Sequence, residues 1–309
     1  MAKKATRTAY GEALVELGNI NKNVVVLDAD LTKSTKTAMF QGKFPERHIN
    51  VGISEGDLMS TAAGLATAGK VAFASTFAVF AAGRGFEQIR NTIAYPKLNV
   101  KIAPTHAGIS VGEDGGSHQS VEDIALMRSI PGMVVLSPAD ATETKKMVHA
   151  AASYDGPVYI RMGRLDVPVL FDEDYDFQIG PANTLKEGTD VTVAATGILV
   201  AEAVKAAEEL AKEGISVRVI NVGTIKPLDG DTILKAAKET KFIVTAEEHS
   251  VIGGLGSAVS EFLGETHPTL VKKIGIYDEF GQSGKGAELL EKYELTAQKI
   301  ISVIKDNLK

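Results

Sequence analysis

Short, almost continuously apolar runs recur along the whole chain, and segments with the amphipathic spacing of helices separate them. A strand that is apolar on both of its faces needs cover on both, which is typical of parallel sheets that lie between helices. We therefore expect an α/β fold in which each domain has a mainly parallel sheet covered by helices. The predicted strands are 24–30, 48–52, 71–75, 100–105, 133–138 and 158–163 in the first half of the chain, and 190–197, 217–222, 241–248 and 270–277 in the second.

The alternation of strands and helices breaks between residues 164 and 189, where prolines, glycines and acidic residues concentrate. Such segments commonly connect domains, and a chain of 309 residues is long enough for about two. We predict a first domain over 1–170, a linker over 171–189, and a second, smaller α/β domain over 190–309.

Composition and charge restrict the class of function. The chain has no cysteine, which excludes disulfides, thiolate metal sites and cysteine nucleophiles and fits a reducing cytoplasm. Its net charge of −6, without clustered Lys and Arg, argues against nucleic acid as a partner. Apolar runs such as 71–82 are shorter than the roughly 20 residues of a membrane helix, and no apolar signal core follows the basic start. We expect a cytoplasmic protein with no membrane partner that acts on small molecules or proteins.

The segment 112–119 combines two carboxylates, three glycines and an imidazole in the sequence GEDGGSHQ. It follows the predicted strand 100–105 and precedes a predicted helix over 120–130, so it lies at the carboxyl end of a parallel strand. Open α/β sheets have their binding sites at that edge. The alternative is an ordinary glycine-rich connector whose Asp and Ser cap the next helix, and the spacing alone leaves both interpretations open.

Glu55 stands between a strand end and a helix start. The helix dipole favours any acidic residue there, so an isolated glutamate at this position is more often structural than functional. Phe77 and Phe80 are three residues apart after another strand, a spacing that is typical of core packing but that would also provide a wall for a ligand ring.

Basic side chains gather at strand ends beside the segment 112–119. His106 ends one predicted strand, and Arg161 and Arg164 end another. This edge of the sheet would suit an anionic ligand such as a sugar phosphate. His249 follows the second-domain strand 241–248 and is either catalytic or an interface residue, and we favour the interface.

Five segments together resemble the C-terminal half of transketolase, and the resemblance covers essentially the whole chain. It implies a pyrimidine-binding domain followed by the transketolase C-terminal domain, without the N-terminal diphosphate domain and its G-D-G motif. The chain contains no such motif. It therefore resembles the smaller subunit of a split transketolase. The segments are VGISEG (51–56), FASTFAVF (73–80), THAGISVGEDGGSHQ (105–119), GPVYIRMGR (156–164) and TIKPLD (224–229).

The resemblance assigns cofactor-binding roles to five residues. Glu55 matches the acid that hydrogen-bonds the pyrimidine of thiamine diphosphate and favours the imino tautomer that takes the proton from the thiazolium carbon. Phe77 and Phe80 match aromatic residues that wall the pyrimidine ring, and Ile53 an apolar residue that keeps the cofactor bent. Asp30 matches an acid near the thiazolium. Many relatives have a third aromatic residue where Gly83 aligns here.

Substrate contacts follow from the same resemblance. Asp114 matches a group that hydrogen-bonds a substrate hydroxyl, and His118 a group close to the reacting oxygens that stabilises charge or relays protons. With Glu55 they form the expected catalytic set. Ser34, His106 and Arg164 match the cluster that receives the terminal phosphate of the sugar.

The implied activity is the transfer of a two-carbon ketol unit from a ketose phosphate to an aldose phosphate, as in the pentose phosphate pathway. The resemblance implies an N-terminal partner subunit that supplies most of the Mg²⁺ or Ca²⁺ site, and we expect no metal ligands in this chain. Because the cofactor lies between domains of different protomers in this family, we expect a heterotetramer of two large and two small subunits.

Three alternatives share this architecture or fold. Deoxyxylulose phosphate synthase has a similar G-x-D-G-x-x-H-Q loop, but Glu113 is the residue that transketolase has. The β subunit of a 2-oxoacid dehydrogenase has a similar size and the same activating Glu, but is not expected to have GEDG with the following His. A non-catalytic homologue would not need to retain Glu55, Asp114 and His118 together.

Overall fold

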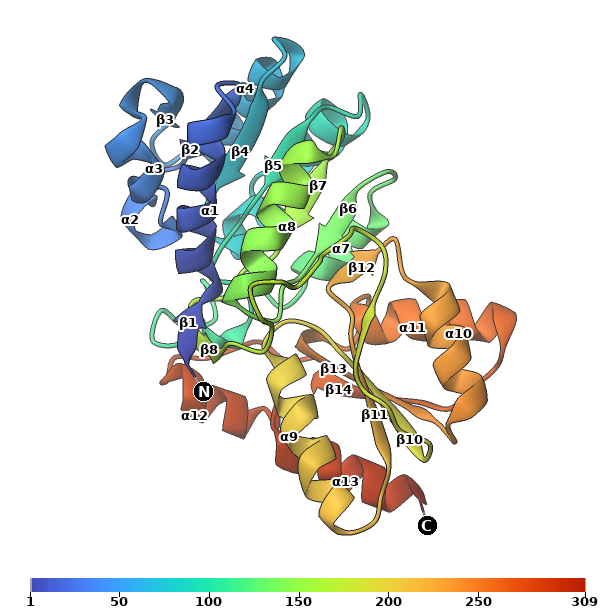
Figure 1. The fold of residues 1–309 in the computed structure, drawn as a ribbon. Coiled ribbons are helices and arrows are strands. Elements are labelled where there is room, and N and C mark those ends of the chain that lie inside the picture. The colour runs from blue at the N-terminus through green and yellow to red at the C-terminus, as the bar shows by residue number, and fades with distance from the viewer. Residues whose placement is uncertain (1, 309) are drawn as a thin grey trace.

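The computed structural model describes residues 2–308 and confirms the predicted fold class, with two domains that each have a mainly parallel sheet between helices (Figure 1). The first sheet has seven strands, and all except β12 run parallel. In spatial order they are β12 (Thr224–Lys226), β6 (Val134–Leu136), β7 (Val158–Ile160), β5 (Val100–Ile102), β4 (Val71–Ser75), β2 (Val24–Asp28) and β3 (His48–Asn50).

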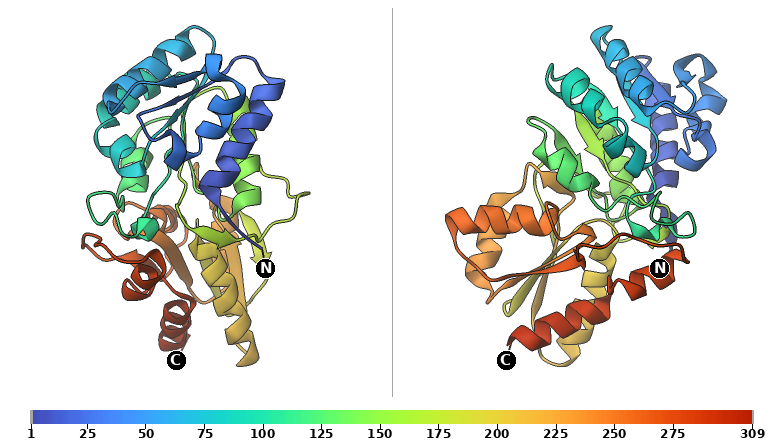
Figure 2. Two further views of the ribbon diagram at one scale, coloured as in Figure 1. Left: turned by 90° about the vertical axis from the view of Figure 1, so that its left-hand side faces the viewer. Right: turned by 180° about the vertical axis from the view of Figure 1, so that it is seen from behind.

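The apolar strand sequences are explained by helices on both faces of the first sheet. Val24 and Val26 of β2 pack with α1, α3 and α8, whereas Val25 and Leu27 pack with α4, η2 and α7. Figure 2 shows the second group of helices from behind. The helices are α1 (Thr6–Ile20), α2 (Thr32–Thr35), α3 (Ala38–Lys43), η1 (Pro45–Arg47), α4 (Glu55–Thr67), α5 (Ala78–Gly83), α6 (Phe86–Gln88), η2 (Ile89–Ala94), η3 (Ile109–Val111), α7 (Asp123–Ser129) and α8 (Ala141–Ser153).

The second sheet has five strands and a core of its own. In spatial order they are β14 (Val271–Ile276), β13 (Ile243–Ser250), β10 (Val191–Ala195), β11 (Val217–Asn221) and the antiparallel β9 (Asn183–Lys186). One face is covered by α9 (Leu199–Lys212) and α13 (Ala297–Leu308), and the other by α10 (Gly230–Glu239) and α11 (Leu255–Thr266). The short α12 (Gly286–Lys292) lies against η3 of the first domain.

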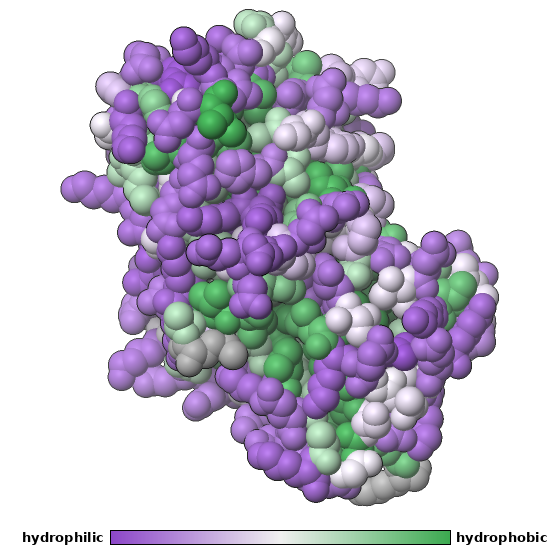
Figure 3. All heavy atoms as spheres, in the orientation of Figure 1, coloured by the Kyte–Doolittle hydropathy of each residue, from purple (hydrophilic) through white to green (hydrophobic). Residues whose placement is uncertain are grey.

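One strand from the second half of the chain joins the sheet of the first domain. β12 follows β11 in sequence but pairs with β6, so it forms an edge of the first sheet. β1 (Lys3–Ala5) pairs with β8 (Asp166–Pro168) in a separate two-stranded sheet. The segment 171–189, which the sequence assigns to a linker, includes β9, because its residues pair with β11. Apolar side chains gather on the face in Figure 3 where β8 meets α9.

The segment after the glycine-rich loop differs from the sequence expectation. The helix predicted over 120–130 is α7, which begins only at Asp123. Ser120 forms a bridge with Ala107, and the carbonyl of Val121 accepts a hydrogen bond from the backbone of Ser250 (2.7 Å). These contacts hold residues 120–122 in an extended path. Within residues 2–308, no helix has both the length and the apolar character to cross a membrane.

Candidate functional site

Several predicted site residues come from segments that follow the strands at one edge of the first sheet. β2, β4 and β5 are parallel neighbours, so their carboxyl ends lie side by side. Asp30, Phe77 and His106 follow these three strands, and Glu55 follows β3 beside β2. The fold thus brings together side chains that are up to 76 residues apart in sequence.

Glu55 is the first residue of α4 and its side chain is buried, with 4% exposed. A buried carboxylate requires a partner. The partner here is Arg84, whose Nη1 donates to both carboxylate oxygens at 3.2 and 3.3 Å. Arg84 is itself 56% exposed, so the ion pair faces solvent on one side.

Phe77 and Phe80 form a wall beside this ion pair. Their rings are stacked with centroids 5.8 Å apart and an interplanar angle of 14°. The guanidinium carbon of Arg84 lies 4.3 Å from the centroid of the Phe80 ring, so Arg84 links Glu55 to the wall. Gly83 leaves open space, because a Cβ built on it meets no atom within 4 Å. Phe86 packs against the hydrophobic core of the first domain.

Two histidines lie against the same aromatic wall. The ring of His106 stacks on Phe77 at 3.9 Å, and the ring of His118 meets Phe80 edge-on at 5.4 Å. The hydroxyl of Ser117 lies 3.0 Å from Nδ1 of His118. Asp114 is exposed in the same loop. The loop 112–119 therefore lies beside the two phenylalanines, and the imidazole of His118 contacts their rings.

A cluster of cations surrounds His106. The pKa of His106 is lowered to about 3, first by burial and then by electrostatic interactions with Arg7, Arg164, His118 and Lys36. The imidazole is therefore neutral at physiological pH. Burial, followed by Arg164, also lowers the pKa of Arg7. Cationic side chains that lie close together repel one another, and an anion bound among them would relieve this repulsion.

Ser34 and Arg164 lie at the border of this cluster. Nη1 of Arg7 donates to the backbone oxygen of Ser34 at 3.0 Å. Nη1 of Arg164 donates to a carboxylate oxygen of Glu113 at 2.9 Å and also to the carbonyl of Val111. Arg164 thus contacts the loop 112–119 and is also close to Arg7 and His106.

The backbone is strained at several positions in this region. Asp30, Lys36 and His106 have φ values of 60°, 71° and 59°. Positive φ is uncommon in residues other than glycine, and strained residues are often found at functional sites. Ile53 is 77% exposed next to Glu55, so its apolar side chain is available for a contact.

Arg161 does not belong to the cation cluster that the strand ends suggest. Its guanidinium is buried and bonds both carboxylate oxygens of Asp123, with the Nε contact at 2.9 Å. The hydroxyl of Tyr159 donates to the same carboxylate at 2.8 Å. The expectation was wrong because side chains alternate along a strand, so residues near its end point in different directions.

Three site residues were not predicted from the sequence: Arg7, Lys36 and Arg84. Arg84 is four residues after Phe80 in a helical segment, a spacing that could have indicated their contact. No comparable local pattern marks Arg7 or Lys36, which reach the site through the fold. Among residues 2–308, no group of three His, Asp or Glu side chains is arranged to hold a metal ion.

The first domain thus presents a buried acid, a stacked aromatic pair and a cluster of cationic side chains at the carboxyl edge of a parallel sheet. This arrangement is typical of α/β proteins that bind a ligand with a ring and an anionic group. Residues 2–169 match the transketolase pyrimidine-binding domain, and residues 180–300 match the transketolase C-terminal domain. The chain belongs to the transketolase family.

Relatives of similar length are known. A Methanocaldococcus jannaschii protein named for the C-terminal section of transketolase is 51% identical, covering 99% of this chain and 97% of its own length. A subunit of 6-deoxy-6-sulfo-D-fructose transketolase from Clostridium is 43% identical, covering 96% of this chain and 92% of itself. A solved structure described as a split gene transketolase, inactive beta4 tetramer, is 56% identical with a TM-score of 0.92, and covers 98% of both chains.

Proposed function

We propose that this chain is the C-terminal subunit of a split transketolase. Together with a separate N-terminal subunit, it transfers a two-carbon ketol unit from a ketose phosphate to an aldose phosphate. The observation that carries the proposal is the contact of Glu55 with Arg84 over the Phe80 ring, with His118 on the same wall. These contacts bring a buried acid, an aromatic surface and the proposed proton-relay group together in one site.

The residues present fit the pyrimidine end of thiamine diphosphate. An aminopyrimidine needs a carboxyl group for its ring nitrogen and an aromatic face for its ring, and Glu55, Phe77 and Phe80 offer both. Ile53, exposed beside Glu55, would contact the bent cofactor, and the carboxylate of Asp30 would face the thiazolium. When bound, thiamine diphosphate supplies a carbon nucleophile that also acts as an electron sink.

The chain's own residues would bind and orient the sugar. His118 would hold or transfer a proton at the reacting oxygens, and Asp114 would accept a hydrogen bond from a substrate hydroxyl. Ser34, His106 and Arg164 would receive the terminal phosphate. Arg7 and Lys36 add positive charge to that cluster, which supports an anionic terminus as the preferred substrate feature.

A partner subunit follows from what this chain provides. In the proposed complex this chain would contact the pyrimidine and the substrate, whereas the diphosphate and Mg²⁺ or Ca²⁺ would be held by the N-terminal subunit. A heterotetramer of two large and two small subunits would give each cofactor both halves of its site. The relative described as an inactive beta4 tetramer supports this need, since it is an assembly of one kind of subunit.

The deciding experiment compares the isolated chain with the complex. We expect no ketol transfer by the purified chain and measurable transfer after addition of the N-terminal subunit, thiamine diphosphate and Mg²⁺. Pyruvate-dependent reactions assayed in parallel should give no turnover. Substantial turnover by the isolated chain, or activity with pyruvate alone, would contradict the proposal.

A further inference from the structure

The end of β13 supplies three consecutive side chains that accept hydrogen bonds from backbone N–H groups. Glu247 accepts from Leu255 and Gly256 at the start of α11 in its own domain (2.7 and 2.8 Å). Glu248 and His249 instead reach the first domain. All three side chains are at most 2% exposed, so these bonds are shielded from water.

Glu248 and His249 hold the two ends of the segment that contains the loop 112–119. Oε1 of Glu248 accepts from the backbone of Ser110 in η3 at 2.6 Å. Nε2 of His249 accepts from the backbone of Ile124 in α7 at 3.1 Å, so His249 lies at an interface between domains. η3 ends directly before the loop, and α7 begins four residues after it.

A second segment of the C-terminal domain contacts both ends of the loop 112–119. Figure 2 shows the chain between β14 and α12 running beside it. The hydroxyl of Ser283 donates to the carbonyl of Glu113 at 2.7 Å. The amide of Gln119 donates to the carbonyl of Gln282 at 2.9 Å. A Cβ on Gly281 would lie 1.8 Å from Oε1 of Gln119, so a larger residue there would displace the Gln119 side chain from its present position.

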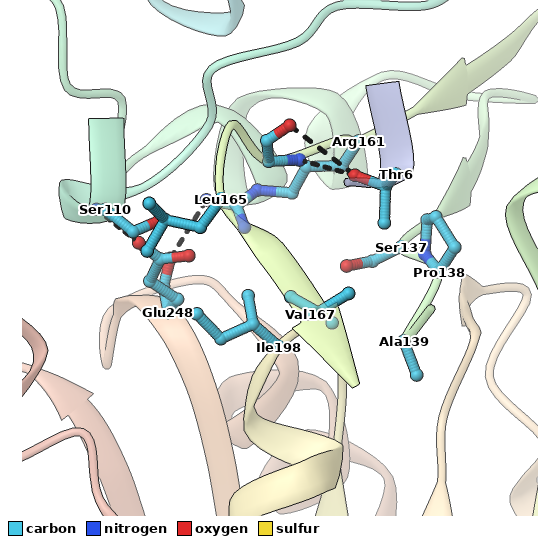
Figure 4. Close-up of a pocket in the computed structure, with 12 residues that line it drawn as sticks. Thr6, Ser110, Ser137, Pro138, Ala139, Arg161, Leu165, Val167, Ile198 and Glu248 are labelled. Carbon is cyan, nitrogen blue, oxygen red and sulfur yellow. Dashed lines mark hydrogen bonds between the residues drawn. The ribbon is translucent and has the colours of Figure 1, made fainter. Parts of the chain in front are cut away.

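The contact between Glu248 and η3 is equally tight. A Cβ on Gly108 would lie 2.2 Å from the carboxyl carbon of Glu248. Figure 4 shows Glu248 and Ser110 side by side at a cavity between the domains, with their hydrogen bond drawn. The backbone oxygen of Glu248 also accepts from Arg161 at 2.9 Å, and Arg161 pairs with Asp123 at the start of α7.

We propose that the C-terminal domain positions the loop that carries Asp114 and His118, with Glu248 and Ser283 as positioning residues. The hydrogen bonds from this domain lie on both sides of Asp114 and His118 in the sequence. The expected effect of this positioning on catalysis rests on the proposed transketolase function. The positioning itself concerns the fold and can be measured without turnover.

The first test is hydrogen exchange in the isolated full-length chain. Glu248→Ala should speed amide exchange at 110–119 by roughly tenfold or more, because a buried bond to the loop is lost. Glu248→Gln keeps an oxygen acceptor and should restore most of the protection. Ser302→Ala removes an exposed hydroxyl on α13 and is the matched control. Unchanged exchange at 110–119 in Glu248→Ala would overturn the proposal, whatever the chain's activity.

The second test measures catalysis in the complex with the N-terminal subunit. Ser283→Ala should lower kcat roughly threefold to tenfold for both a phosphorylated donor and hydroxypyruvate, with an unchanged dissociation constant for thiamine diphosphate. In a background with both Asp114→Ala and His118→Ala the same change should have little further effect, because the residues it positions are gone. An equal effect in both backgrounds would show general destabilisation and overturn the positioning role. A wild-type complex without ketol transfer would refute the proposed function instead, and the exchange test would then decide the positioning role.

Discussion

Replacing Arg84 by alanine tests whether the Glu55 site depends on a cation within the chain. In the structure of residues 2–308, Arg84 is the group that donates hydrogen bonds to the Glu55 carboxylate. The substitution leaves that carboxylate buried and unpaired, and it also exposes the face of Phe80 that the guanidinium covers at 4.3 Å. We expect the isolated chain to lose stability.

The size of the loss follows from the unequal burial of the two partners. Breaking a fully buried ion pair costs about 3–5 kcal/mol, whereas a surface pair contributes about 0–1 kcal/mol. Glu55 is 4% exposed but Arg84 is 56% exposed, so water screens one side of the pair. We therefore expect a loss of about 1–2 kcal/mol, which corresponds to a fall in Tm of roughly 2–6 °C for a chain of this size.

Thermal unfolding followed by circular dichroism at neutral pH measures this change. Arg90→Ala is the matched control, because it removes an equal charge from an exposed arginine whose contact is Asn91. In a Glu55→Gln background, Arg84→Ala should cost much less, since a neutral amide does not need the cation. An unchanged Tm for Arg84→Ala, or an equal loss in the Glu55→Gln background, would refute the reasoning.

The same substitution has a consequence for cofactor binding if the proposed function is right. A pyrimidine ring would use the carboxylate and the aromatic face that Arg84 now occupies. Arg84→Ala should then tighten the binding of thiamine diphosphate to the complex about threefold to tenfold, as measured by calorimetry. Weaker binding would instead make Arg84 a cofactor ligand.

Other predictions concern chemistry, substrate binding and pH. Glu55→Gln should lower turnover about a hundredfold or more without unfolding the chain, and near-normal deuterium exchange at the thiazolium carbon would contradict this role. Arg164→Ala should raise KM for phosphorylated donors about tenfold to a hundredfold but hardly affect KM for hydroxypyruvate, whereas His118→Ala should slow turnover of both donors. Steady-state kinetics test this prediction. An equal increase in KM for both donors in Arg164→Ala would show that Arg164 has a structural role. Burial lowers the pKa of His249 to about 4 in the folded chain. Between pH 6.5 and pH 4 the unfolded chain therefore binds a proton at this histidine that the folded chain does not. The stability present above pH 6.5 is lost as pH falls toward 4. The loss should reach about 2 kcal/mol at pH 5, and His249→Gln should lose less between pH 7.5 and 5 in thermal melts; equal losses would contradict the assignment.

The longer apolar strands were predictable because each one is encoded locally, whereas the short strands β1, β8, β9 and β12 were not predicted. The unbroken apolar run of β2, for example, requires helices on both faces, and all five of its residues are buried. The start of α4 at Glu55 and the position of the loop 112–119 after β5 also follow from local pattern. Strand partners outside this rhythm were not predictable, since β12 pairs across the domains with β6, and the choice depends on packing that its three residues do not encode.

For the site, the sequence by itself determined the candidate residues and the edge of the sheet at which we expected them. Short segments of sequence were enough to predict the glycine-rich loop and the positions of Glu55, Phe77 and His106 at strand ends. Only the tertiary structure decided their partners. The contacts of Ser110 with Glu248 and of Ile124 with His249 join residues 138 and 125 positions apart. The periodicity of apolar residues indicates which face of a helix or strand is buried. It does not indicate which distant residue contacts that face, because that contact depends on how whole domains pack.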